Sequence, residues 1–134
     1  MTSISHNRPP PTVLLVEDHV DTRHMFAEFL RSDFIVLEAG DGVGALALMG
    51  QTLPDVVVTD LSLPIMTGFE LVERMRADQR LKLIPVIALS GYSDADHESR
   101  ALGAGVDLVL QKPCLPDVLA RTVAAAATSR NEGR

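Results

Sequence analysis

The sequence predicts an α/β domain built on a parallel sheet, and two features of its pattern support that fold class. Five short apolar runs alternate with segments in which apolar residues recur at the spacing of an amphipathic helix. The run Val56-Val57-Val58 carries no polar residue, as is typical of a strand buried on both faces. Strands that alternate with helices in this way favour a parallel sheet.

The elements can be assigned in chain order from these patterns. Asp18 or Asp21 is expected to cap the first helix, which carries Met25, Phe29 and Leu30 at helical spacing. We expect strands at residues 13–16, 34–37, 54–60, 85–89 and 106–110. The later helices are expected at 43–49, closed by Gly50; after 67, with Phe69, Val72 and Met75 on one face; at 94–102, closed by Gly103 and Gly105; and at 115–126.

Length and composition indicate one globular domain. Hydrophobic residues make up 46% and charged residues 22% of the 134 residues, an ordinary globular balance. We expect a flexible, proline-rich leader at 1–11, the domain at 12–127, and a polar, frayed tail at 128–134.

Charge, cysteine content and hydropathy exclude several classes of protein. A net charge of -6 without a basic run argues against a nucleic-acid partner. No apolar run approaches the ~20 residues of a membrane helix, so no membrane partner is expected. The single cysteine, Cys114, forms no internal disulfide and fits a reducing, cytoplasmic location. We expect it to be a reduced, partly buried residue rather than a redox sensor.

Polar residues stand at the ends of four of the five expected strands. Because the carboxyl ends of parallel strands meet at one edge of the sheet, these side chains are expected to share one crevice. A lone acid there is usually a helix cap and a lone lysine is usually solvated, but the joint occurrence favours a site. Its members are Glu17 and Asp18 after the first strand, Asp60 after the third, Ser90 after the fourth and Lys112 after the fifth.

The expected chemistry of this crevice is phosphoryl transfer. Two carboxylates ~4 Å apart repel by about 4 kcal/mol at an effective dielectric constant of ~20, so either one is protonated or a hard cation neutralises them. Oxygen ligands without a histidine cluster favour Mg²⁺. Lys112 and Ser90 suit a phosphate-like group, and Asp60 suits an oxygen nucleophile.

The same residues resemble the receiver domain of bacterial two-component response regulators. The motifs are the 14–18 run that ends in Glu17-Asp18, the 54–68 stretch with Pro64 and Gly68 after Asp60, the 88–91 run, and Lys112-Pro113. The resemblance spans about residues 12–127 and implies a flavodoxin-like, doubly wound (βα)5 fold with strand order 2-1-3-4-5.

The resemblance implies a role for each residue. Asp60 would accept a phosphoryl group from a phosphohistidine on a sensor histidine kinase or a histidine phosphotransfer protein, with Ser90 and Lys112 contacting that group. The Lys112–Pro113 bond would be cis. The chain would catalyse only its own phosphorylation and dephosphorylation, and its downstream protein target is not identified. The Mg²⁺ ligands would be Asp18, Asp60 and the backbone carbonyl of Ser62, with Glu17 acting mainly through water.

Val109 departs from the family pattern. The family usually carries Tyr or Phe three residues before the lysine, and a valine cannot report phosphorylation by turning a ring. A phosphate sink or an interaction-only module with weak switching is therefore the alternative function. An aspartyl-phosphate phosphatase is disfavoured, because Ser62 stands where that chemistry uses a second aspartate.

Overall fold

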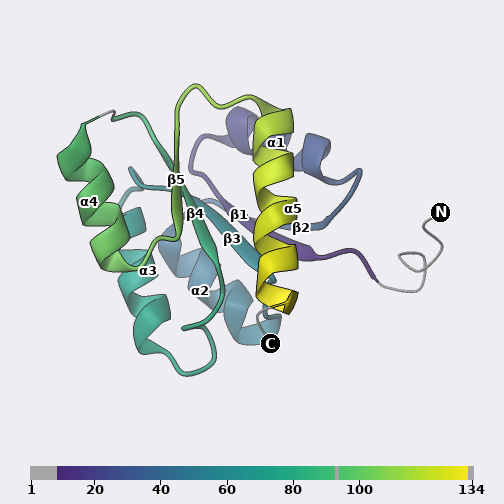
Figure 1. Ribbon diagram of the computed structural model, residues 1–134, viewed down its shortest axis with the longest axis horizontal. Coiled ribbons are helices and arrows are strands. Elements are labelled where there is room, and N and C mark those ends of the chain that lie inside the picture. The colour runs from purple at the N-terminus through teal and green to yellow at the C-terminus, as the bar shows by residue number, and fades with distance from the viewer. Residues whose placement is uncertain (1–8, 93, 133–134) are drawn as a thin grey trace.

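The computed structural model describes residues 9–92 and 94–132, so residues 1–8 of the leader predicted at 1–11 and the end of the predicted tail lie outside it. Five parallel strands form one sheet in the order β2-β1-β3-β4-β5 (Figure 1), which confirms the predicted fold class. The elements are β1 (Thr12–Val16), α1 (Val20–Leu30), β2 (Ile35–Ala39), α2 (Gly42–Gln51), β3 (Val56–Asp60), α3 (Gly68–Ala77), β4 (Val86–Ser90), α4 (Ala95–Ala104), β5 (Leu108–Gln111) and α5 (Pro116–Glu132).

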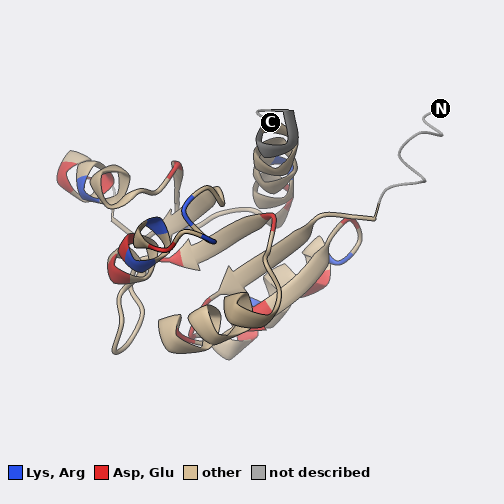
Figure 2. Cartoon of the chain, turned by 90° about the horizontal axis from the view of Figure 1, so that it is seen from below, with Lys and Arg blue, Asp and Glu red and all other residues tan. Residues whose placement is uncertain are grey.

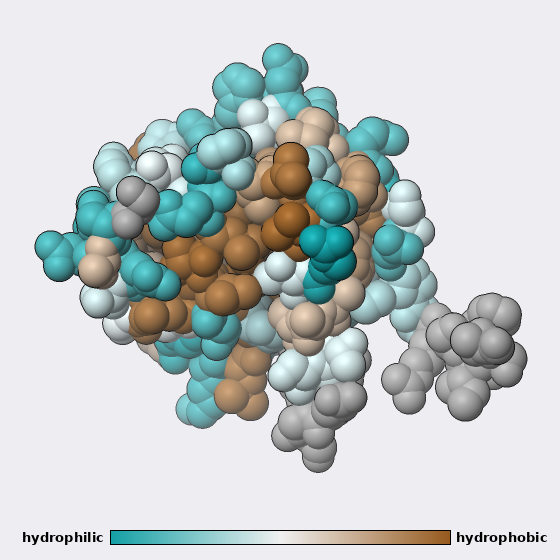
Figure 3. All heavy atoms as spheres, turned by 45° about the horizontal axis from the view of Figure 1, so that its top comes forward, coloured by the Kyte–Doolittle hydropathy of each residue, from teal (hydrophilic) through white to brown (hydrophobic). Residues whose placement is uncertain are grey.

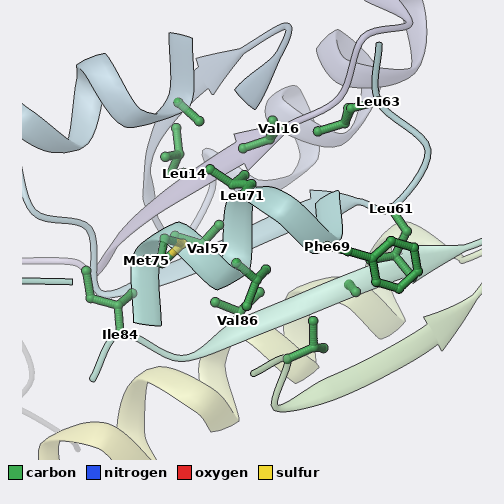
Figure 4. Close-up of a cluster of buried hydrophobic side chains, with 14 of the residues drawn as sticks. Leu14, Val16, Val57, Leu61, Leu63, Phe69, Leu71, Met75, Ile84 and Val86 are labelled. Atoms are coloured by element: carbon green, nitrogen blue, oxygen red, sulfur yellow. The ribbon is translucent and has the colours of Figure 1, made fainter. Parts of the chain in front are cut away.

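Helices cover both faces of the sheet and create two cores. α1 and α5 lie together on one face, whereas α2, α3 and α4 lie on the other (Figure 1). Figure 4 shows Phe69, Leu71 and Met75 of α3 packed over the strand residues Val57 and Val86. All five residues of the central strand β3 are buried, as its unbroken valine run predicts.

Pairing within the sheet, rather than local apolarity, determines where the strands begin and end. β2 pairs with β1 along its whole length: Ile35 lies opposite Thr12, and Ala39 lies opposite Val16. β2 therefore extends beyond the expected 34–37 segment. β5 starts only at Leu108. The Asp107 amide donates to the Val86 carbonyl at 2.9 Å, but the Val86 amide donates at 2.7 Å to the Asp107 carboxylate rather than to a backbone carbonyl.

Predicted helix boundaries were wrong in four helices. α4 continues through Gly103 to Ala104, and only Gly105 caps it. His19, rather than Asp18 or Asp21, caps α1: its side chain accepts a hydrogen bond from the Thr22 amide. α2 continues through Gly50 to Gln51. α5 continues to Glu132, so the tail is helical rather than frayed over most of its length. In α2 and α5 the helical hydrogen-bond ladder outweighs a local signal for a break, whereas in α1 a different side chain serves as the cap.

Charged residues lie mainly outside the buried sheet. Acidic and basic residues are scattered over helices and loops, and the strands are mostly uncharged (Figure 2). Within residues 9–92 and 94–132, no helix combines the length and the apolar character needed to cross a bilayer.

Gly68 allows the start of α3 to lie directly against the end of β3. A Cβ atom built on Gly68 would collide with the backbone carbonyl oxygen of Asp60 and would lie 2.7 Å from the Leu61 Cα atom. The Gly68 amide also donates a 3.0 Å hydrogen bond to the Leu61 carbonyl. The spacing between Asp60 and Gly68 therefore reflects a backbone contact that holds the strand end in place.

We expect Gly68→Ala to lower the free energy of unfolding by about 2 kcal/mol, because the clash involves backbone that cannot rotate away. Gly50→Ala is the matched control. It also lies in a helix, but nothing lies within 4 Å of its added Cβ atom, so a gain of about 0.5–1 kcal/mol is expected. Urea titration of both variants measures the difference, and equal stability of the two would contradict this account of Gly68.

Candidate functional site

Three carboxylates meet at the carboxyl ends of β1 and β3. Glu17, Asp18 and Asp60 each offer an oxygen ligand, and these atoms all lie within 4.8 Å of one another. Glu17 and Asp60 are only 3% and 4% exposed, whereas Asp18 is exposed. The parallel register brings them together, because β1 and β3 are direct neighbours in the sheet. Because His19 provides the cap of α1, the side chain of Asp18 is not used as that cap.

Lys112 provides the positive charge of the site. Its Nζ atom lies 2.6 Å from Asp60 Oδ2 and 3.8 Å from Glu17 Oε1. The residue follows directly after β5, where its amide donates a 2.7 Å hydrogen bond to the Ser90 carbonyl. The Lys112–Pro113 peptide bond is cis, as predicted.

The pKa values of these groups reflect burial and mutual charge. Burial raises the pKa of the Glu17 carboxyl above its ordinary value, and the Asp60 charge adds to this, against opposing effects of the His19 amide and Lys112. Burial opposes ionisation of Lys112, but its hydrogen bond to Asp60 and the charges of Asp60, Glu17 and Asp18 outweigh burial and raise the pKa of the ammonium group. Lys112 therefore remains a cation while Glu17 ionises reluctantly.

Ser62 and Ser90 both make hydrogen bonds that the sequence did not predict. The Ser62 amide donates a 3.0 Å hydrogen bond to Asp60 Oδ1, an interaction that the expected role for its carbonyl did not include. Ser90 is 2% exposed on β4, next to β3. Its hydroxyl is engaged by the loop that follows, since Oγ accepts from the Tyr92 amide at 3.1 Å and donates to the Tyr92 carbonyl at 3.2 Å.

Arg23 is a supporting residue that sequence reasoning missed. Its Nη1 atom donates a 2.8 Å hydrogen bond to the Glu17 carbonyl, and its Nε atom donates to Glu38 Oε1 at 3.1 Å. Glu38 also accepts a 3.0 Å bond from Arg31. Burial disfavours ionisation of Glu38, but the hydrogen bonds from Arg31 and Arg23 outweigh it and lower the pKa of Glu38. The only sequence signal was Glu38 itself, a polar residue on the second strand.

An open pocket of about 690 Å³ adjoins the site. Glu17, Lys112, Met25, Phe26 and Cys114 are among its lining residues. Cys114 is partly buried, and burial, with the nearby charge of Asp117, raises the pKa of its thiol. A thiol with a raised pKa forms little thiolate, which fits the unreactive role predicted for it.

Among the described residues, the three acids form the one cluster of carboxylate, histidine and cysteine groups with the spacing of a metal site. A set made only of oxygen donors, two of them buried, fits a hard divalent cation such as Mg²⁺ rather than a softer metal. The chemistry of the donor set is therefore compatible with the predicted ion.

Comparison with known proteins supplies the family. A model described as the response regulator receiver domain matches residues 13–124. The chain belongs to this family. Its receiver domain is 33% identical over 125 residues to the hybrid signal transduction histidine kinase D of Dictyostelium discoideum, covering 93% of the chain. It is 38% identical over 103 residues, 77% of the chain, to the sensor histidine kinase TmoS of Ectopseudomonas mendocina.

Solved structures agree with this assignment. The chemotaxis response regulator CheY4 of Vibrio cholerae superposes with a TM-score of 0.82 at 30% sequence identity, covering 87% of this chain and 98% of that one. The domain is thus homologous to receivers of both response regulators and hybrid histidine kinases. It spans only 8% of kinase D and 11% of TmoS.

We expect Glu17→Gln to stabilise the metal-free receiver domain at neutral pH by on the order of 1 kcal/mol, because it removes a buried charge that the fold disfavours. The folded pKa of Glu17 lies above the ordinary value of 4.5. The folded state therefore binds more protons than the unfolded state just above that pH, and the stability contributed by this group falls as pH rises.

The difference between Glu17→Gln and the wild type should accordingly be small at about pH 4 and larger at about pH 7 in urea titrations without divalent cations. A variant that is less stable than the wild type at neutral pH would contradict this electrostatic assignment.

We expect Arg23→Gln to weaken binding of Mg²⁺ roughly tenfold. The Glu17 carbonyl then loses the hydrogen-bond donor that holds the acidic turn, which is the turn that carries Glu17 and Asp18. Arg31→Gln is the matched control, since Arg31 also binds Glu38 but makes no described contact with Glu17. Calorimetric titration with MgCl₂ measures both affinities. An equal loss in the two variants would assign the effect to Glu38 instead of the carbonyl contact.

Proposed function

We propose that the receiver domain accepts a phosphoryl group onto Asp60 from a phosphohistidine of a histidine kinase or a histidine phosphotransfer protein. One observation carries this proposal. The Asp60 carboxylate ends the central strand 2.6 Å from the Lys112 ammonium group, and oxygens of Glu17 and Asp18 complete a cluster within 4.8 Å. The proposed nucleophile, the lysine ammonium group and the proposed metal ligands thus lie together at one edge of the sheet.

The transfer conserves atoms and charge. An Asp60 carboxylate oxygen attacks phosphorus in line, the new P–O bond forms, and the P–N bond to the donor imidazole breaks with its electron pair returning to nitrogen. Lys112 then balances the negative charge on the phosphoryl oxygens. Ser62 and Lys112 already contact the two Asp60 oxygens, so little reorganisation precedes the reaction.

Mg²⁺ is the proposed cofactor. Asp18 and Asp60 would hold it, together with the Ser62 carbonyl, and Glu17 would contribute mainly through bound water. When bound, the ion neutralises the carboxylates and the charge that develops on the phosphoryl group. Asp18 is the exposed member of the cluster, so its carboxylate would be accessible to an ion from solvent.

The partner's phosphohistidine needs to approach Asp60. The 690 Å³ pocket is lined by two neighbours of that carboxylate, Glu17 and Lys112, although not by Asp60 itself. Met25 of α1 lines this pocket. Met25 and Phe29, one helical turn apart on α1, are both exposed and suit an apolar protein surface. We assign the domain a signalling role in the cytoplasm rather than that of an enzyme acting on other substrates, since the reaction modifies only its own carboxylate.

Two outputs are compatible with phosphorylation. Binding to a downstream protein would use the face of α4, β5 and α5, where Figure 3 shows hydrophobic side chains gathered between the two helices. Leu102 and Leu108 are 48% and 45% exposed there. The alternative, a phosphate sink with weak switching, is favoured by Val109, which supplies no ring to report the change.

Incubation of the whole chain with acetyl phosphate and Mg²⁺ tests the proposal. We expect one phosphoryl group per chain, detected by intact mass, which is stable in mild acid and released by base. Asp60→Asn should abolish the adduct, because an amide is a poor nucleophile.

Asp33→Asn is the control for a surface aspartate outside the site, and it should be labelled like the wild type. Absence of an adduct on the wild type, or an undiminished adduct on Asp60→Asn, would overturn the proposed function.

A further inference from the structure

The position that usually carries the switching ring is occupied by Val109, which packs against the core beneath α4. Aromatic side chains instead gather one strand away, around the loop between β4 and α4. Tyr92 is 50% exposed in this loop. Its ring stacks on that of His97, with the centroids 4.1 Å apart and the planes 12° from parallel.

His97 connects this loop to the first turn of α4. Its amide donates a 2.7 Å hydrogen bond to Asp94 Oδ1, and its ring Nδ1 lies 3.1 Å from both Asp94 carboxylate oxygens. Asp94 is also the N-cap of α4. The imidazole is therefore held at the helix terminus on one side and by the Tyr92 ring on the other, so displacement of Tyr92 acts on the start of α4.

Two further side chains extend the contacts to α3. The Phe69 ring lies 6.5 Å from the His97 ring, and the Arg100 guanidinium lies 3.9 Å over Phe69. We refer to Phe69, Tyr92, His97 and Arg100 together as the aromatic cluster.

Ser90 connects the aromatic cluster to the phosphorylation site. A hydroxyl group can donate only one hydrogen bond. Ser90 donates that bond to the Tyr92 carbonyl, and its oxygen accepts a hydrogen bond from the Tyr92 amide. Donation to a phosphoryl oxygen on Asp60 would require Ser90 to give up the bond to the Tyr92 carbonyl. Gly91, between the two, would meet no atom within 4 Å even with a Cβ, so the loop has space to shift.

α4 is also the helix that can respond most easily. Only Ala101 of its residues is buried, whereas α3 buries five residues. A helix with few buried contacts opens or shifts at a lower free-energy cost than a well-packed one.

We propose that the aromatic cluster transmits phosphorylation of Asp60 to α4, in place of the ring that position 109 lacks. The Ser90 hydroxyl redirects its hydrogen bond from the Tyr92 carbonyl to a phosphoryl oxygen while its O–H bond stays intact. The loop then shifts, the Tyr92–His97 stack is lost, and the N-terminal turn of α4 moves. This inference rests on the proposed function, and it predicts a conformational switch where a phosphate sink would show none.

The chain offers a direct probe, because Tyr92 is its one tyrosine and it has no tryptophan. Tyrosine fluorescence therefore reports on this ring alone. We expect emission intensity to change when the whole chain is phosphorylated with acetyl phosphate and Mg²⁺, and the backbone amide NMR signals of α4 to shift with it. The extent of phosphorylation is measured separately by intact mass.

His97→Ala should be phosphorylated like the wild type, but the shifts of its α4 amides should fall about threefold or more. Its tyrosine emission should already resemble that of the phosphorylated wild type. His97→Gln keeps a polar group near Asp94 without an aromatic ring, and it should behave in the same way. Ser99→Ala, an exposed substitution on α4 outside the aromatic cluster, should retain the full response.

Two results would overturn the inference while leaving the proposed function intact. One is a phosphorylated wild type whose Tyr92 emission does not change, and the other is a phosphorylated His97→Ala or His97→Gln whose α4 amides shift fully. Failure of the wild type to be phosphorylated would instead overturn the proposed function.

Discussion

The ion pair between Lys112 and Asp60 is the interaction on which the site depends. Two buried carboxylates, Glu17 and Asp60, face each other at the sheet edge, and their repulsion would oppose folding without a nearby cation. The Lys112 ammonium group lies 2.6 Å from one and 3.8 Å from the other. Loss of that charge would leave both acids buried with only backbone amide donors and no cation, which is more costly than loss of a surface ion pair. Because Lys112 follows the edge strand β5 and Asp60 ends the central strand β3, the pair also connects two strands that are not neighbours.

The receiver domain combines a rigid frame around Asp60 with a loosely held segment beside it. β3 is fully buried, and Gly68 brings the start of α3 into contact with the Asp60 backbone, so Asp60 has little room to move. α4 and the loop before it are held by exposed or half-exposed contacts, chiefly the stack of Tyr92 on His97. A modification at the rigid end can therefore have its structural effect at the loose end, where a shift costs less free energy.

The separation of roles between neighbouring residues depends on small differences in capping and hydrogen bonding. His19 caps α1, so the adjacent Asp18 points its charge into the acidic cluster instead of at the helix terminus. Arg23 holds the Glu17 carbonyl and is itself held by Glu38, whose charge Arg31 also neutralises. The acidic turn is thus supported from outside the site, as metal-binding carboxylates usually are.

The sequence by itself determined the fold class, the strand order through its family motifs, and the set of polar residues at the strand ends. It could do so because a valine run between Pro54 and Asp60 and a lysine before Pro113 are local patterns with few alternative meanings. It could not assign the cap to His19, the end of α5 to Glu132, or the supporting role to Arg23, since these depend on competition between neighbouring hydrogen bonds. Only the tertiary structure decided that Ser90 bonds to Tyr92 and that Tyr92 stacks on His97. These contacts form in and beside a short loop, where no hydrophobic periodicity predicts which side chains meet.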